Sequence, residues 1–337
     1  MWITSECTNL IQKRNNEMRY VVIFLINLLF CVILINRKDS ALFNIGQMTN
    51  LEVIDHYQKN IVADTRTYTN MPKDDMFRTV GYPLILKLFL KSDNFILLLL
   101  LFNCLIGTWF FYVLYQMIGR KAWIFFALGG IISYIPLILT DLLFATIFVT
   151  AIWQIKKRLW LHFLLIGIAS LIRPSLAFFF LIEPFVLYFY GYRGSYPVLG
   201  FIIIFLVTSF SPIRNYVNHG IFTHSTVLHL NMTHDKYIAG ANSKIGYMIK
   251  AFIANNLGSH WSFIGLVFSK YPNPPWLKLN YIGAFFNGII WGRFLWNVYQ
   301  RRVNYGNVLI LIYFIGPALL AANGARMRLP IEWILFL

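Results

Sequence analysis

The amino-acid sequence predicts an all-α membrane protein, a polytopic bundle of about nine to eleven transmembrane helices. Hydrophobic residues make up 58% of the 337 positions and charged residues only 12%, whereas an ordinary soluble domain carries about 25% charged residues. The apolar residues also gather in long runs such as 95–118, which reach the roughly 20 residues that one helical crossing needs. The alternating ten-residue segments typical of a membrane β-barrel do not occur.

The first apolar run, 20–36, follows a polar stretch and has no small-residue cleavage site after it. We therefore expect a retained first helix rather than a removed signal peptide. The other candidate spans are 95–118, 122–140, 141–155, 159–173, 174–191, 196–212, 281–300 and 307–322, with a short end at 331–337. Together they predict a single transmembrane domain over 1–337.

Basic residues orient the bundle. Every second turn between the spans is basic: "GRK" at 119–121, "KKR" at 156–158, "GYRG" at 191–194 and "QRR" at 300–302. Cytoplasmic loops of membrane proteins carry an excess of Lys and Arg, so these turns and the basic N-terminus are expected on the cytoplasmic side. The long loops 37–80 and 213–280 are then external.

The net charge of +16 does not indicate nucleic-acid binding. The basic residues are scattered between apolar runs and do not gather on a polar helix or beside stacking aromatics. The three cysteines, Cys7, Cys31 and Cys104, lie far apart and predict neither a disulfide framework nor a metal site. Four histidines recur every five residues between His219 and His234, a spacing that shares no helix face. We favour a plain polar loop over a metal site here and expect no cofactor, while metal dependence stays open.

Four arginines fall on the predicted external side: Arg173, Arg214, Arg326 and Arg328. A single arginine at a helix end often extends to lipid headgroups, and that reading stays open for each of them. The planar guanidinium also suits phosphate oxygens. The external loop 37–80 holds six of the thirteen acidic residues. The arginines and acids together suggest a lipid-phosphate substrate and a carboxylate that acts on its reaction partner.

Six segments resemble one family, in the order that the family has them. They are "ADTRTY" (63–68), "FRTVGYPLILKLF" (77–89), "TDLLFATIFVTAIW" (140–153), "GIASLIRPSLAFFFLI" (167–182), "SPIRNYVNHGIF" (211–222) and "GARMRLPIEWILFL" (324–337). The chain resembles the GT-C membrane glycosyltransferases, in particular the bacterial relatives of protein O-mannosyltransferases and lipid A aminoarabinose transferases. It departs from the family pattern at Val80, Asp141 and Met327, where proline, glutamate and tyrosine are usual.

The resemblance implies a GT-C fold and an inverting transferase. Such an enzyme moves a sugar from a polyprenyl phosphate to a lipid, glycan or protein acceptor at the external face of the membrane. A carboxylate of the first external loop is then the general base, and arginines at helix ends hold the donor phosphate. We choose Asp64 as the base because Tyr68 follows it as in the family motif. The alternatives are Asp39, Asp75 and Asp55.

The same resemblance assigns the donor phosphate to Arg326, Arg328, Arg214 and Arg173. It gives supporting places to Tyr68, Tyr82, Asp141 and Tyr216. Residues 50–63 have apolar positions spaced for one helix face, and they predict an interfacial helix in the first external loop.

Two other functions stay open. A flippase or transporter of a lipid-linked glycan needs ionisable residues inside the membrane, and Glu183, before Pro184, is an acid within an apolar run. A membrane acyltransferase needs a catalytic histidine on a helix, and His162 is the one within a predicted span. Bacterial cytoplasmic membrane is the expected location.

Overall fold

The structure is a computed structural model of the whole chain, and all of its described elements are helical. It describes residues 3–38, 40, 42–60, 69, 80–127, 131–138, 140–173, 177–191, 196–223, 288–289, 292–293 and 295–300. The α-helices are α1 (Ile3–Asn36), α2 (Asn50–Asn60), α4 (Gly81–Phe89), α5 (Phe95–Ile118), α6 (Lys121–Ala127), α7 (Thr140–Gln154), α8 (Leu159–Ile172), α9 (Ala177–Phe189), α10 (Tyr196–Thr208) and α11 (Phe210–His219). Two short 3-10 helices lie at Ile45–Gln47 and Ile132–Tyr134.

Three helical segments in the described residues are long and apolar enough to cross a membrane: Glu17–Asn36, Phe95–Ile118 and Tyr196–His219. Shorter apolar helices lie at Thr140–Gln154, Leu159–Ile172 and Phe180–Phe189. Large apolar side chains such as Leu25, Leu29 and Leu206 are exposed on these helices. Lipid can cover such side chains where water would not, so the chain is a membrane protein.

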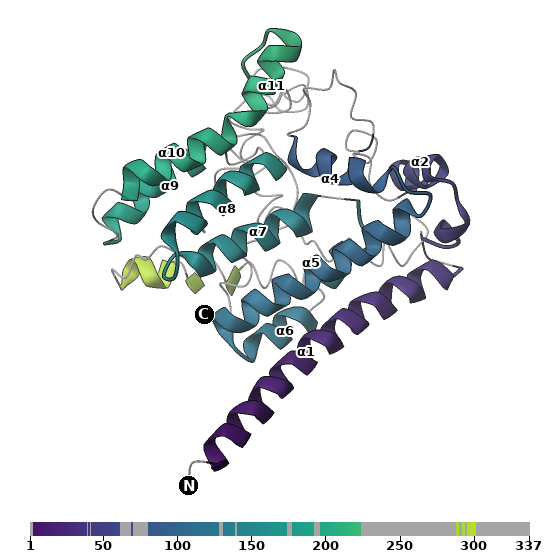
Figure 1. Cartoon of the computed structure of the whole chain (residues 1–337), viewed down its shortest axis with the longest axis horizontal. Coiled ribbons are helices and arrows are strands. Elements are labelled where there is room, and N and C mark those ends of the chain that lie inside the picture. Colours follow the sequence, from purple (N-terminus) through teal and green to yellow (C-terminus); the bar gives the residue numbers. More distant parts are fainter. Residues whose placement is uncertain are drawn as a thin grey trace.

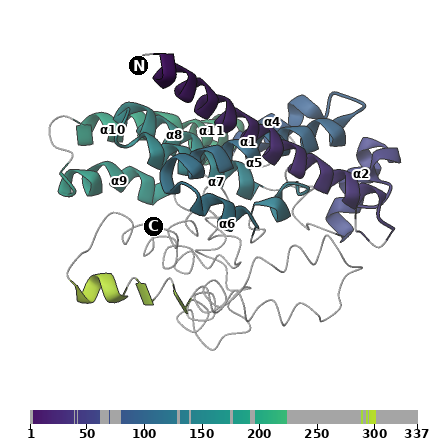
Figure 2. The same cartoon turned by 90° about the horizontal axis from the view of Figure 1, so that it is seen from below.

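The long helices form a row in which each packs on the next. The order across the row is α1, α5, α7, α8 and α10 (Figure 1). Helix α9 packs against both α8 and α10, and the turned view shows it beneath α10 (Figure 2). The row leaves α7 and α8 in the middle, with neighbours on both sides.

The first two basic turns come to the same end of the bundle. Helices α5 and α7 run in the same direction, since the Tyr112 and Trp153 rings lie 5.8 Å apart and the Trp109 indole donates to Thr150 at 3.1 Å. The turns that follow these helices, 119–121 and 155–158, are therefore neighbours. We call this end the basic end, and the end where α7 begins the Asp141 end.

One predicted span is wrong in form. Residues 122–140 are not a single helix: α6 stops at Ala127, and 131–138 form turns and one 3-10 turn. Non-helical backbone inside a membrane protein needs internal hydrogen-bond donors. The Asn103 amide of α5 supplies them, at 2.8 Å to the Ile135 carbonyl oxygen and 3.1 Å to that of Leu137.

Helix α2 is anchored to the same non-helical stretch. The buried Tyr57 hydroxyl donates to the Pro136 carbonyl at 2.5 Å, and burial raises the pKa of Tyr57, which keeps that proton in place. Val53 is fully buried while Leu51 is 76% exposed. Helix α2 is thus amphipathic as predicted, but its buried face packs on the protein.

The start of α2 is a capping box. The Thr49 backbone N–H donates to the Glu52 carboxylate at 2.8 Å, and the Glu52 N–H points back to the Thr49 hydroxyl at 3.4 Å. This arrangement satisfies backbone donors at a helix start. The Thr49 hydrogen bonds hold the pKa of Glu52 below its ordinary value of 4.5.

Acid is therefore expected to loosen the start of α2. A carboxylate with a lowered pKa stabilises the fold above its ordinary pKa, and this contribution disappears as the pH falls through the lowered value. Amide exchange of residues 50–54 should accelerate in that acidic window, after correction for its intrinsic pH dependence. A Glu52→Gln variant should show no such step, and an identical step in both proteins would assign it to another group.

Candidate functional site: two buried polar pairs along α8

Four segments of the family resemblance meet at the Asp141 end. Helix α7 begins there, α8 ends there, α4 begins against α8, and α11 continues α10 (Figure 1). Gly81 makes the contact between α4 and α8 possible, because a Cβ at this position would lie 2.7 Å from the Leu171 carbonyl oxygen. Tyr82 follows it and is fully buried. Residues far apart in the sequence therefore converge around the last turn of α8.

Asp141 and Arg173 form a buried ion pair at this end. The Arg173 Nη1 donates to Asp141 Oδ1 at 2.5 Å, and the side chains are 9% and 1% exposed. Asp141 lies in the first turn of α7 and Arg173 directly follows α8. Each charge thus lies at the helix end whose dipole favours it. The Arg173 guanidinium also lies 5.9 Å from the centre of the Phe144 ring.

One oxygen of the pair remains available. Among the described residues, Asp141 Oδ2 is buried and has no hydrogen-bond partner. A buried carboxylate oxygen without a donor is unfavourable by about 1–3 kcal/mol or more. The pair can therefore accept a further hydrogen bond from a group that reaches this end of the bundle.

Helix α11 holds the predicted Arg214 in a fixed position. Its Nε donates to Asn215 Oδ1 at 2.9 Å, and the buried Asn215 amide donates to the Thr223 carbonyl at 2.7 Å. Tyr216, on the same helix, is 59% exposed. Arg214 thus lies at the Asp141 end on α11, with its guanidinium oriented by a neighbour that is itself held.

The remaining predicted residues divide into two groups. Asp55 lies on α2, is partly buried and takes part in polar interactions. The others lie outside the described residues: Asp39, Asp64, Tyr68, Asp75, Arg326 and Arg328.

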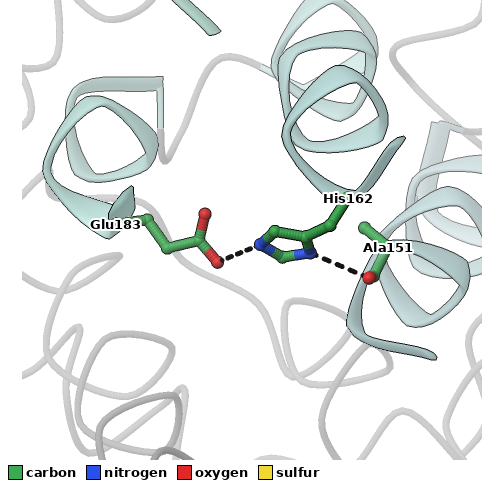
Figure 3. Close-up of polar contacts among 3 residues, drawn as sticks. All are labelled: Ala151, His162 and Glu183. Carbon is green, nitrogen blue, oxygen red and sulfur yellow. Dashed lines mark hydrogen bonds and ion pairs between the residues drawn. The ribbon is translucent and has the colours of Figure 1, made fainter. Parts of the chain in front are cut away.

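A second buried pair lies nearer the basic end (Figure 3). His162 is in the first turn of α8 and Glu183 is in the middle of α9. His162 Nε2 lies 2.7 Å from Glu183 Oε1, and His162 Nδ1 lies 2.8 Å from the Ala151 carbonyl oxygen of α7. The side chains are 0% and 1% exposed. This one contact set joins α7, α8 and α9.

Hydrogen-bond chemistry fixes the number of protons in this pair. The Ala151 carbonyl can only accept, so His162 Nδ1 carries a proton and donates it. A second proton must lie between His162 Nε2 and Glu183 Oε1, because two lone pairs do not hold a contact of 2.7 Å. Whichever atom carries that bridging proton, the pair as a unit is electrically neutral.

Aromatic side chains separate the two pairs. Arg173 follows His162 by eleven residues, which is about 16 Å along a helix. Phe144 and Phe148 of α7 stack at 6.0 Å, and Phe148 stacks on Phe180 of α9 at 6.2 Å. All three rings are buried. The centre of the bundle thus contains the Asp141–Arg173 ion pair, an aromatic stack and the His162–Glu183 pair.

Sequence reasoning found the members of both pairs but neither pairing. A signal for the first was present: Asp141 and Arg173 are each sixteen residues from Lys157, in the turn that joins α7 and α8. In an antiparallel helix pair, residues equidistant from the turn lie opposite each other. For the second, a buried acid requires a partner, and His162 was the histidine available within a span.

Cys31 and Cys104 were also unexpected neighbours. Both are buried free thiols, on α1 and α5, and their side chains interact. Within the part of the chain that the structure describes, no group of three or more His, Cys, Asp or Glu side chains is arranged to hold a metal ion.

In comparisons with known proteins, no family model, no curated protein and no solved structure matches the chain.

Proposed function

We propose that the chain is a polytopic GT-C-type glycosyltransferase with about nine to eleven transmembrane helices. It transfers a sugar from a polyprenyl-phosphate donor to a lipid, glycan or protein acceptor at the external face of a bacterial cytoplasmic membrane. The observation that carries this proposal is the meeting of α4, α7, the end of α8 and α11 at the Asp141 end. These are four of the six segments that resemble the family.

The placement of charge supports the orientation. The basic turns 119–121 and 155–158 lie at the opposite end from Asp141 and Arg173, and basic turns favour the cytoplasmic side. The Asp141 end is then external, on the side where a polyprenyl-phosphate sugar would present its headgroup to the enzyme.

The proposed mechanism needs two kinds of group. A phosphate leaves readily when arginines neutralise its charge, and we assign this role to Arg326, Arg328, Arg214 and Arg173. The pairing of Arg173 with Asp141 gives it a second role, because it holds the end of α8 to the start of α7. The acceptor hydroxyl needs a general base, and we assign that to Asp64, with Asp39, Asp75 and Asp55 as alternatives.

The decisive experiment incubates the purified chain in lipid with a panel of radiolabelled polyprenyl-phosphate sugars and candidate acceptors, followed by analysis of the products. Asp64→Asn is expected to lower transfer by about 10²–10⁴-fold, because asparagine cannot take the proton of the acceptor. Donor binding should be unchanged. The exposed Asp93, at the Asp141 end of α5, provides a matched control, and Asp93→Asn should leave transfer unchanged.

The outcomes distinguish a wrong choice of base from a wrong mechanism. Loss of transfer in Asp39→Asn, Asp55→Asn or Asp75→Asn, with Asp64→Asn active, would move the base within the same loop. Full activity in all four variants would contradict a loop carboxylate as base. Absence of transfer with every donor and acceptor tested would contradict the proposed glycosyltransferase activity.

The second candidate function is a transporter of a lipid-linked glycan. The buried His162–Glu183 pair favours it, because ionisable residues inside membrane helices often line transport or proton pathways. A transporter would move the labelled donor across vesicle membranes with the sugar–phosphate bond intact. Product analysis in the same vesicles distinguishes this from transfer.

A further inference from the structure

The His162–Glu183 pair has no place in the proposed transfer reaction. It lies about 16 Å along α8 from Arg173, and buried aromatic rings separate it from the Asp141 end. It is nevertheless a buried pair of ionisable side chains among apolar helices. Such groups are rare in this setting, because isolated charges are strongly disfavoured there.

The contact holds together only with its bridging proton. Without that proton, His162 Nε2 would turn a lone pair towards a carboxylate oxygen 2.7 Å away. Rotation of the ring or a change of tautomer does not repair this, because the other ring nitrogen would then face the Ala151 carbonyl without a proton. The pair would also carry a net negative charge with no water to solvate it.

Helix α9 is the element that such a loss would release. Pro184 directly follows Glu183 inside α9, and proline has no N–H for the carbonyl one turn earlier. The helix is therefore weakened where the pair holds it to α8. Only residues 174–176 separate Arg173 from the start of α9, so a shift of α9 acts directly on the Asp141 end.

The other ionisable groups of α7 to α10 that the structure describes lie toward the helix ends or in the turn before α8. They are Asp141 and Arg173 at the far end, Tyr188 on α9 and Tyr196 on α10, which are about half exposed, and the exposed Lys156, Lys157 and Arg158, the last of them one turn before His162.

We propose that the His162–Glu183 pair is a proton-binding site that locks α9 onto α7 and α8. Proton loss passes the bridging proton to a water-borne base and leaves Glu183 as a carboxylate facing neutral His162, and α9 then moves to hydrate the charge. The proton-bound form is the closed form. The proposal does not rest on the transferase reaction, since its readout is the mobility of α9.

The test is hydrogen–deuterium exchange of the full chain in lipid nanodiscs, from mildly acidic to mildly alkaline pH. After correction for intrinsic rates, exchange of residues 185–189 in the wild type is expected to rise with pH. One proton released per opening sets a limit of about tenfold per pH unit. Exchange of α5 residues 99–110 serves as the internal reference and should not follow this trend.

Glu183→Gln separates a proton site from a purely structural clamp. The glutamine amide can donate permanently to His162 Nε2 while Nδ1 still donates to Ala151, so the clamp keeps its hydrogen bonds without a removable proton. The variant should therefore stay closed and lose the pH trend. Glu183→Leu removes the hydrogen bond together with the carboxylate, so its α9 exchange should be raised at every pH.

Two results would overturn the proposal. One is corrected α9 exchange in the wild type that does not change with pH, which would make the pair a structural contact only. The other is a pH trend that persists in Glu183→Gln, which would assign the proton to a different group. Either result would leave the transferase proposal untouched.

Discussion

Replacing Arg173 with methionine is expected to lower the free energy of unfolding by about 3–5 kcal/mol, because it leaves the buried Asp141 carboxylate without its partner. Methionine keeps much of the aliphatic volume, so the loss reports on charge more than on packing. The Asp141 side chain is 1% exposed and cannot recover solvation by a small movement. Thermal or denaturant-induced unfolding of the purified protein in mild detergent measures the effect.

The matched control is the double variant Asp141→Asn with Arg173→Met. Removing both charges avoids the uncompensated carboxylate, and replacement of a whole buried pair is often nearly neutral. The double variant is therefore expected to be more stable than Arg173→Met alone. Effects that simply add in the double-mutant cycle would show that the two side chains do not interact.

Asn103→Leu is the second substitution with a large expected effect. The leucine keeps the size of the side chain but removes the amide that donates to the Ile135 and Leu137 carbonyls. Each buried carbonyl left without a donor costs about 1–3 kcal/mol, so a loss of about 2–6 kcal/mol is expected in the same unfolding assay.

Asn36→Leu provides the comparison for that substitution. The Asn36 amide also donates to a backbone carbonyl, that of Val32, at 2.8 Å, but this site is exposed. Water can replace the lost donor there, so the stability should change little. Equal losses for Asn36→Leu and Asn103→Leu would contradict a structural role for the Asn103 amide in the buried stretch.

Hydropathy predicted the long helices well and failed at one segment for a physical reason. The runs 95–118 and 159–173 correspond closely to α5 and α8, because an uninterrupted apolar run of that length has few other ways to satisfy its backbone. The run 122–140 is equally apolar, yet it contains Pro136. Its non-helical part depends on a donor from another helix, which no local pattern can reveal.

The sequence predicted which residues belong to the candidate site better than it predicted the contacts between them. Motif resemblance pointed to Asp141 and Arg173 one by one, and their symmetric distance from the α7–α8 turn would have paired them. The Glu183 contact involves a third helix, whose rotation and depth depend on packing against α8 and α10. Helices α8 and α10 themselves pack closely, since a Cβ at Gly200 of α10 would lie 2.6 Å from the Phe163 ring of α8.

The dependence of residues 131–138 on Asn103 has a consequence for biogenesis. The chain is synthesised from its N-terminus, so α5 leaves the ribosome before the carbonyls of Ile135 and Leu137 do. The donor is therefore in place when the non-helical stretch enters the bilayer, where it cannot satisfy its own backbone. A fragment that begins after α5 lacks this donor. Insertion of residues 131–138 into the membrane therefore depends on α5 being present.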